Sequence, residues 1–85
     1  MPLTVCTWNI NSVRLREGLV LRLLEQEGPD VLCLQETKCP VDKFPRERFE
    51  ALGYRHIVAR GEKGYNGVAI LSRLPLEEIG RASCR

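Results

Sequence analysis

Two short strand-like segments on either side of a helical pattern constrain the fold of this chain most. Residues 3–8 alternate in polarity and are rich in β-forming residue types. Val31–Gln35 is an almost continuous apolar run bounded by turn signals, which is typical of a buried strand. Between them, residues 14–27 predict a helix. It should stop at Gly28-Pro29, because glycine suits a helix C-terminus and proline cannot continue the helix.

This strand–helix–strand order predicts two parallel strands joined by a right-handed crossover. The carboxyl ends of both strands then lie at the same edge of the sheet. Asn9 and Glu36 follow these two ends. If the strands are neighbours, we expect the two residues about 5 Å apart. In open α/β sheets this edge is where ligands bind.

The rest of the chain predicts one short helix and a hairpin. Residues 45–52 suit a helix, with Pro45 in its first turn and Gly53 at its end. Residues 54–59 and 67–72 suit two strands. The glycine-rich segment between them predicts an antiparallel pairing. In the long helix we expect one apolar stripe, made of Leu19, Val20, Leu23 and Leu24.

Composition excludes several classes of protein. The 85 residues suffice for one small domain, and 44% hydrophobic with 28% charged residues is typical of a soluble globular protein. No segment approaches the roughly 20 apolar residues of a membrane span. A net charge of +2 permits a nucleic-acid partner without requiring one. The four cysteines show no CxxC spacing, so we expect no zinc site and a reduced, cytoplasmic chain.

Glu36 is the main candidate for chemistry. A carboxylate at the end of a buried strand either caps another group or holds a cation, because an unpaired buried charge is costly, and we expect a divalent metal. Mg²⁺ prefers oxygen ligands and needs only one or two carboxylates, so Glu36 with the Asn9 amide fits such a site. The alternative is a surface pair between Glu36 and Lys38, with Asn9 and Asn11 serving only as turn residues.

Several residues could contact phosphate. Arg14 and Lys38 lie near the same predicted edge, and the loop around Lys63 and Tyr65 has glycines that let a backbone approach a polyanion. The alternatives are a solvated arginine and an ordinary hairpin loop. His56 falls within a predicted strand, where a structural or surface role is expected.

Three motifs together resemble a known family. Residues 7–14, 29–38 and 64–72 are similar, in order and spacing, to N-terminal motifs of the exonuclease III-type abasic-site endonucleases, within the endonuclease/exonuclease/phosphatase superfamily. The Gln-Glu-Thr-Lys string at 35–38 favours the DNA-repair branch over the phosphoinositide and sphingomyelin branches. The resemblance covers about residues 3–76.

The resemblance implies an α/β fold, the N-terminal part of a four-layered α/β sandwich, in the order β-α-β-(short α)-β-β. It implies hydrolysis of the DNA phosphodiester 5′ to an abasic site with Mg²⁺ or Mn²⁺, together with 3′-exonuclease activity. The residues that match the family's candidate catalytic positions are Asn9 and Glu36, and those that match its metal positions are Glu36, Asn9 and Asn11. The residues that match positions near the DNA backbone are Arg14, Lys38, Gly64 and Tyr65.

The implied partner is double-stranded DNA with abasic or 3′-blocked sites, bound by a monomer in the bacterial cytosol or nucleoid, without membrane association. We expect residues 1–76 to form the N-terminal portion of the domain and residues 77–85 to be a non-native tail, since its last seven residues resemble the translation of a sequencing adapter. The family's proton-abstracting residues lie in the second half of its fold. We therefore expect one exposed sheet face and no activity from these 85 residues alone.

Two alternatives remain. One is another metal-dependent phosphodiesterase or phosphatase of the same superfamily. The other is a noncatalytic nucleic-acid-binding module, using the basic and aromatic residues Arg14, Lys38, Lys63 and Tyr65.

Overall fold

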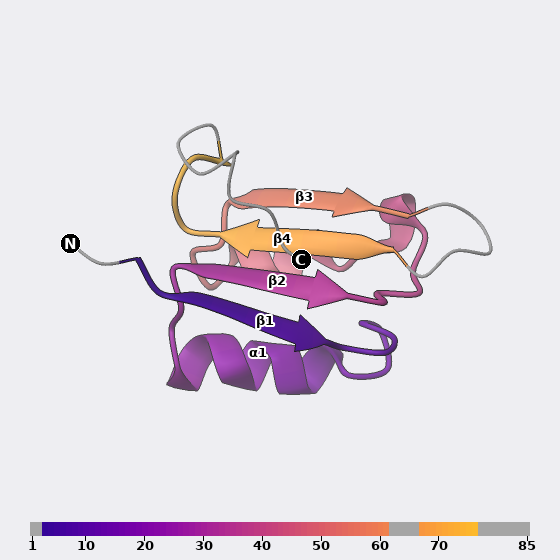
Figure 1. The fold of residues 1–85 in the computed structure, drawn as a ribbon, viewed down its shortest axis with the longest axis horizontal. Helices are drawn as coiled ribbons and strands as arrows, with labels where there is room; N and C mark the ends of the chain where they lie inside the picture. The colour runs from indigo at the N-terminus through magenta and orange to yellow at the C-terminus, as the bar shows by residue number, and fades with distance from the viewer. Residues whose placement is uncertain (1–2, 62–66, 77–85) are drawn as a thin grey trace.

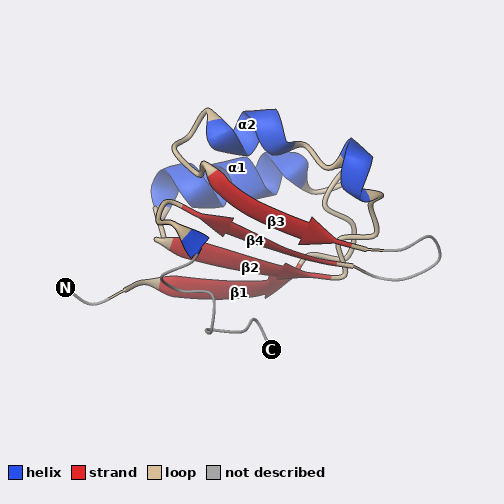
Figure 2. Ribbon diagram, turned by 90° about the horizontal axis from the view of Figure 1, so that it is seen from above, coloured by secondary structure: helices blue, strands red, loops and turns tan. Residues whose placement is uncertain are grey.

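The computed structural model describes residues 3–61 and 67–76. A four-stranded mixed sheet carries its helices on one side (Figure 2). The elements, in chain order, are strand β1 Val5–Asn9, helix α1 Glu17–Gln26, strand β2 Val31–Gln35, the 3₁₀-helix η1 Val41–Lys43, helix α2 Arg46–Glu50, strand β3 His56–Arg60 and strand β4 Val68–Ser72. The predicted element order is thereby confirmed, and η1 is an addition within an expected loop.

The sheet has the strand order β1-β2-β4-β3 (Figure 1). β1 pairs with β2 in parallel, and β3 pairs with β4 antiparallel, as the sequence predicts. β4 also pairs antiparallel with β2, which leaves β3 at the edge. Both parallel strands therefore end at the same edge, where Asn9 is the register partner of Gln35, the residue before Glu36.

Element boundaries differ from the predicted ones by two or three residues at several ends. β1 begins at Val5 rather than Leu3 and extends to Asn9. α1 begins only at Glu17, because the chain after β1 first makes a turn in which the Arg16 N–H donates to the Ser12 carbonyl at 3.3 Å. Gly28, just after α1, has φ +53°, which is the left-handed conformation expected for a C-terminal glycine.

The core lies between the sheet and the helices. Leu32 and Leu34 point from β2 into this core, where they join fully buried residues of the loops and helices. α1 contributes Val20 and Leu24, while Leu19 remains 50% exposed. The predicted apolar stripe of α1 was therefore wrong at Leu19, because that position lies at the margin of the helix face that contacts the sheet.

Tyr54, which is fully buried, connects the segment before β3 to the segment between α1 and β2. Its hydroxyl donates a hydrogen bond to the Pro29 carbonyl at 2.6 Å. The Arg73 guanidinium lies 5.0 Å from the centre of its ring. Burial raises the pKa of the Tyr54 phenol, and the nearby Arg73 charge opposes that shift to a smaller extent.

Neither α1 nor α2 lies on the opposite face of the sheet (Figure 2). Residues of all four strands form one row across it, namely Thr7, Cys33, Ile70 and Val58. Near its margins Val5 and Val68 are 50% and 44% exposed. The expectation of an exposed second face is thus met at these margins but not at Cys33, which is 4% exposed.

The cysteines differ in state. Cys6 and Cys39 are free thiols. Cys33, in contrast, is disulfide-bonded in this structure, so the expectation of a fully reduced chain was wrong at this position. No helix among the described residues is long and apolar enough to cross a membrane. The predicted tail at residues 77–85 lies outside the described residues, and that expectation stays a prediction.

Candidate active site

The loops after β1 and β2 run side by side and are joined by backbone hydrogen bonds. The N–H groups of Ile10, Ser12 and Val13 donate to carbonyls of the second loop at 3.0, 2.9 and 2.9 Å. Ile10 and Val13 are fully buried, so this first loop is anchored by its side chains as well. The two loops therefore form one hydrogen-bonded platform at the carboxyl edge of the sheet.

Asn9 and Glu36 meet on this platform. The Asn9 side-chain amide donates a hydrogen bond to a carboxylate oxygen of Glu36. Asn9 is exposed and Glu36 is half-buried, so both remain accessible from solvent. The predicted proximity of the two residues is confirmed, and the amide leaves the remaining oxygen lone pairs of the carboxylate available to a cation.

Lys38 pairs with Asn11 rather than with Glu36. Its ammonium group donates to the side-chain oxygen of Asn11 at 2.6 Å. The ion pair found among the described residues joins Arg48 to Glu17 and involves neither Lys38 nor Glu36. The alternative, a surface ion pair between Lys38 and Glu36, is therefore not formed in this structure.

The same loops concentrate unusual backbone conformations. Non-glycine residues with positive φ are uncommon and cluster at functional sites. Those described here are Asn11 (φ 48°), Ser12 (φ 89°), Glu36 (φ 52°) and Lys38 (φ 48°). All four lie in the two loops that carry the predicted site. The Arg16 guanidinium also donates to the Asn11 carbonyl, which helps to hold the first loop in this shape.

Arg14 lies in the first loop and is exposed. Its positive charge interacts electrostatically with the thiol of Cys39, the residue after Lys38. Burial raises the pKa of the Cys39 thiol, and Arg14 opposes that shift to a smaller extent. Gly64 and Tyr65, the other predicted DNA contacts, lie outside the described residues, as does Lys63.

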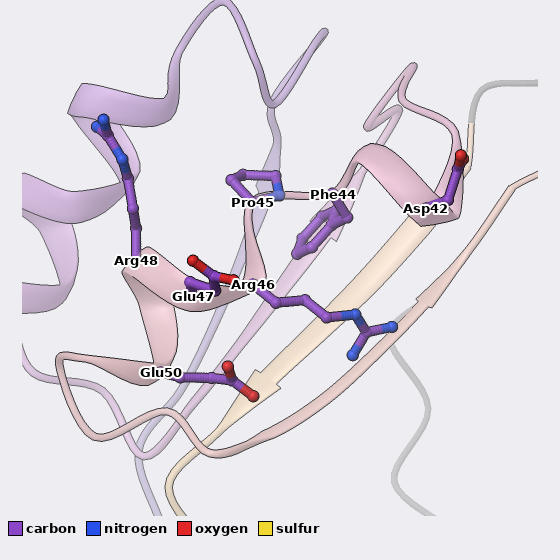
Figure 3. Close-up of a pocket in the computed structure, with 7 residues that line it drawn as sticks. All are labelled: Asp42, Phe44, Pro45, Arg46, Glu47, Arg48 and Glu50. Atoms are coloured by element: carbon purple, nitrogen blue, oxygen red, sulfur yellow. The ribbon is translucent and has the colours of Figure 1, made fainter.

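A shallow hollow elsewhere is unrelated to this platform (Figure 3). It lies over η1 and α2, and none of the predicted site residues lines it. Acidic and basic side chains alternate around it, and Arg46 from its wall donates to the Ile57 carbonyl at 3.0 Å. We therefore place the candidate site at the carboxyl edge of the sheet.

The platform also contains two positions to which the sequence pattern assigned no role. Thr37, between Glu36 and Lys38, is only 2% exposed. Gly67, at the start of β4, packs directly against it. Thr37 lies inside the recognisable string at 35–38, but only the fold shows that it contacts β4.

Residues 6–84 match the model of the "Endonuclease/Exonuclease/phosphatase family". The chain belongs to this family. It is 42% identical over 75 residues to exodeoxyribonuclease III of Haemophilus influenzae, a match that covers 88% of this chain and 28% of that protein. It is 40% identical over 75 residues to recombination repair protein 1 of Drosophila melanogaster, covering 85% of this chain and 11% of the relative.

Solved structures of the endonuclease/exonuclease/phosphatase family agree with the fold. An AP endonuclease from Archaeoglobus fulgidus aligns with a TM-score of 0.79 and 47% identity, covering 85% of this chain and 28% of that one. A 3′-5′ exonuclease from Neisseria meningitidis aligns with a TM-score of 0.79 and 45% identity, covering 86% and 28%. The chain thus corresponds to the N-terminal part of the family fold and spans little more than a quarter of these relatives.

Proposed function

We propose that this chain is the N-terminal part of a metal-dependent DNA-repair nuclease that cleaves the phosphodiester 5′ to abasic sites and also acts on 3′ ends. The observation that carries the proposal is the pairing of Asn9 with Glu36 at the ends of two adjacent parallel strands. The names of the relatives support it: one is an exodeoxyribonuclease III, another an AP endonuclease, and a third is a 3′ phosphatase from Neisseria bound to product DNA hairpin. We propose double-stranded DNA as the partner of a cytoplasmic monomer.

The side chains of the platform fit a hard divalent cation. Glu36 supplies one carboxylate and Asn9 an amide oxygen, while Asn11, whose amide oxygen accepts from Lys38, supports the site from the same platform. No group of three or more histidine, cysteine, aspartate or glutamate side chains is assembled for a metal within the described part of the chain. This donor set suits Mg²⁺ or Mn²⁺, since such ions keep several waters and use few carboxylates together with substrate phosphates. It does not suit a zinc site, which needs several nitrogen or sulfur ligands.

Each residue of the platform would have a distinct role in the proposed reaction. Glu36 would hold the cation, and the Asn9 amide would fix the orientation of that carboxylate. Lys38, held by Asn11, and Arg14 would place positive charge beside the DNA backbone. When bound, the divalent cation would supply Lewis-acid stabilisation of charge on the phosphate oxygens.

A chimeric enzyme tests this function. Residues 3–76 of this chain would replace the matching segment of Haemophilus exodeoxyribonuclease III, and the chimera would be assayed on a duplex with one abasic site. We expect Mg²⁺-dependent incision, and we expect Glu36→Gln to lower its rate by at least about 100-fold. The matched control is Glu25→Gln, an equivalent change at an exposed position of α1, which should leave the rate unchanged.

A folded chimera that leaves abasic DNA intact would contradict the proposal. Hydrolysis of a phosphoinositide in its place would support another branch of the same family.

A further inference from the structure

Thr37 is the junction at which three segments of the chain meet. Its carbonyl accepts a hydrogen bond from the Val13 N–H, in the loop after β1, at 2.9 Å. Its N–H donates to the Gly67 carbonyl, at the start of β4, at 3.2 Å. The residue itself is 2% exposed. The backbone of Thr37 is thus hydrogen-bonded on one side to the loop after β1 and on the other to the residue before β4.

Gly67 packs against Thr37 more closely than any other residue type would allow. A Cβ atom built on Gly67 would lie 2.5 Å from Thr37 Oγ1 and 3.1 Å from the Arg60 carbonyl oxygen. Neither neighbour can easily withdraw, because the first is buried and the second is backbone. Gly67 also has φ +81°, a conformation that residues with a side chain rarely adopt.

The conformations of the residues on either side of Thr37 depend on these hydrogen bonds and on the contact with Gly67. Glu36 and Lys38 both have positive φ, and such conformations persist only where the surroundings enforce them. Glu36 faces Asn9, and Lys38 faces Asn11. A displacement of Thr37 would therefore move the carboxylate and the ammonium group together.

We propose that Thr37 and Gly67 form a clamp that positions Glu36 and Lys38 for the proposed reaction. Thr37 is a positioning residue, and Gly67 is required because its lack of a side chain lets β4 approach the loop. The inference rests on the proposed function for its metal readout only. The hydrogen bond between Asn9 and Glu36 gives a second readout that needs no metal.

The test compares two glycine substitutions in the 85-residue chain. Gly67→Ala introduces the contact with Thr37. Gly53→Ala is the matched control, because Gly53 also has positive φ, at +98°, but has no atom within 4 Å of an added Cβ. The side-chain amide signals of Asn9 are followed by NMR, and Glu36→Gln defines where they lie when the carboxylate is lost. We expect Gly67→Ala to move these signals toward the Glu36→Gln position and Gly53→Ala to leave them in place.

Manganese titration gives the second readout. We expect Gly67→Ala to weaken Mn²⁺ binding by about 10-fold, as for other residues that support a metal ligand, and Gly53→Ala to leave it unchanged. The double variant Thr37→Ala/Gly67→Ala lacks the atom at 2.5 Å, so its Asn9 signals should match those of Thr37→Ala alone, with no further shift from the alanine at position 67. If Gly67→Ala does not fold, Thr37→Ala alone must still disturb the Asn9 signals.

Equal effects of the two glycine substitutions would overturn the clamp, as would unchanged Asn9 signals in Thr37→Ala. A parent chain that binds no Mn²⁺ would instead count against the proposed metal site, while the Asn9 signals would still decide the inference.

Discussion

At the scale of single residues, the site depends on which polar groups pair with each other. Asn9 bonds to Glu36, and Lys38 bonds to Asn11, although each pair is separated by 27 positions in the chain. The exposed Lys38 therefore keeps its positive charge unneutralised by Glu36. Its charge is available to a phosphate, and its position is set by a neutral amide.

We predict that Lys38→Met weakens binding of a duplex by the 85-residue chain and lowers the salt dependence of that binding. Loss of one phosphate contact should reduce the slope of log affinity against log salt by about 1. The measurement is a titration by fluorescence anisotropy between about 50 and 200 mM salt. Arg22→Met, which removes one charge at an exposed position of α1, is the control and should leave the slope unchanged. Identical slopes for Lys38→Met and the parent chain would refute the assigned contact.

At the scale of secondary-structure elements, α1 shows how much of its apolar pattern contributes to the core. Leu24 is 2% exposed, while Leu19, five positions earlier on the same helix, is 50% exposed. The sequence pattern included both in one stripe. Burial against the sheet, rather than helix periodicity alone, therefore decides which leucines stabilise the fold.

We predict that Leu24→Ala lowers the free energy of unfolding by about 2–5 kcal/mol, because it removes buried methyl groups and leaves a cavity. Leu19→Ala, the same change on the same helix, should cost roughly 1 kcal/mol or less. Urea unfolding followed by circular dichroism measures both. Since small domains are stable by only about 5–15 kcal/mol, Leu24→Ala should unfold at markedly lower urea. Similar losses for the two variants would show that α1 does not pack as described.

At the scale of the whole molecule, the described residues form one sheet with α1 and α2 on the same side. It spans 28% of its Haemophilus relative, so most of the family fold has no counterpart in it. In the two loops of the platform, residues 10–16 and 36–40, Glu36 is the one acidic residue. In the proposed site Glu36 would hold the cation, and the described residues of the two loops offer no second carboxylate to deprotonate an attacking water.

We predict that the purified 85-residue chain does not turn over abasic DNA with Mg²⁺, because proton abstraction from the attacking water has no candidate base on the platform. Gel analysis of a labelled abasic duplex measures this, with the chimera described above as the positive control. Incision by the chain at a rate near that of the chimera would show that the residues on this platform suffice for catalysis.

The sequence by itself determined the four strands, the helices α1 and α2, their order and the parallel pairing of the first two strands. It also determined that Asn9 and Glu36 share one edge of the sheet. These features follow from periodicity and turn residues within single segments, together with the handedness of the crossover.

Only the tertiary structure decided that β4 lies between β2 and β3, that Lys38 pairs with Asn11, and that Gly67 closes on Thr37. Such contacts join segments that are far apart in the chain. They depend on strand register and on the close approach of backbones, neither of which leaves a local pattern in the sequence.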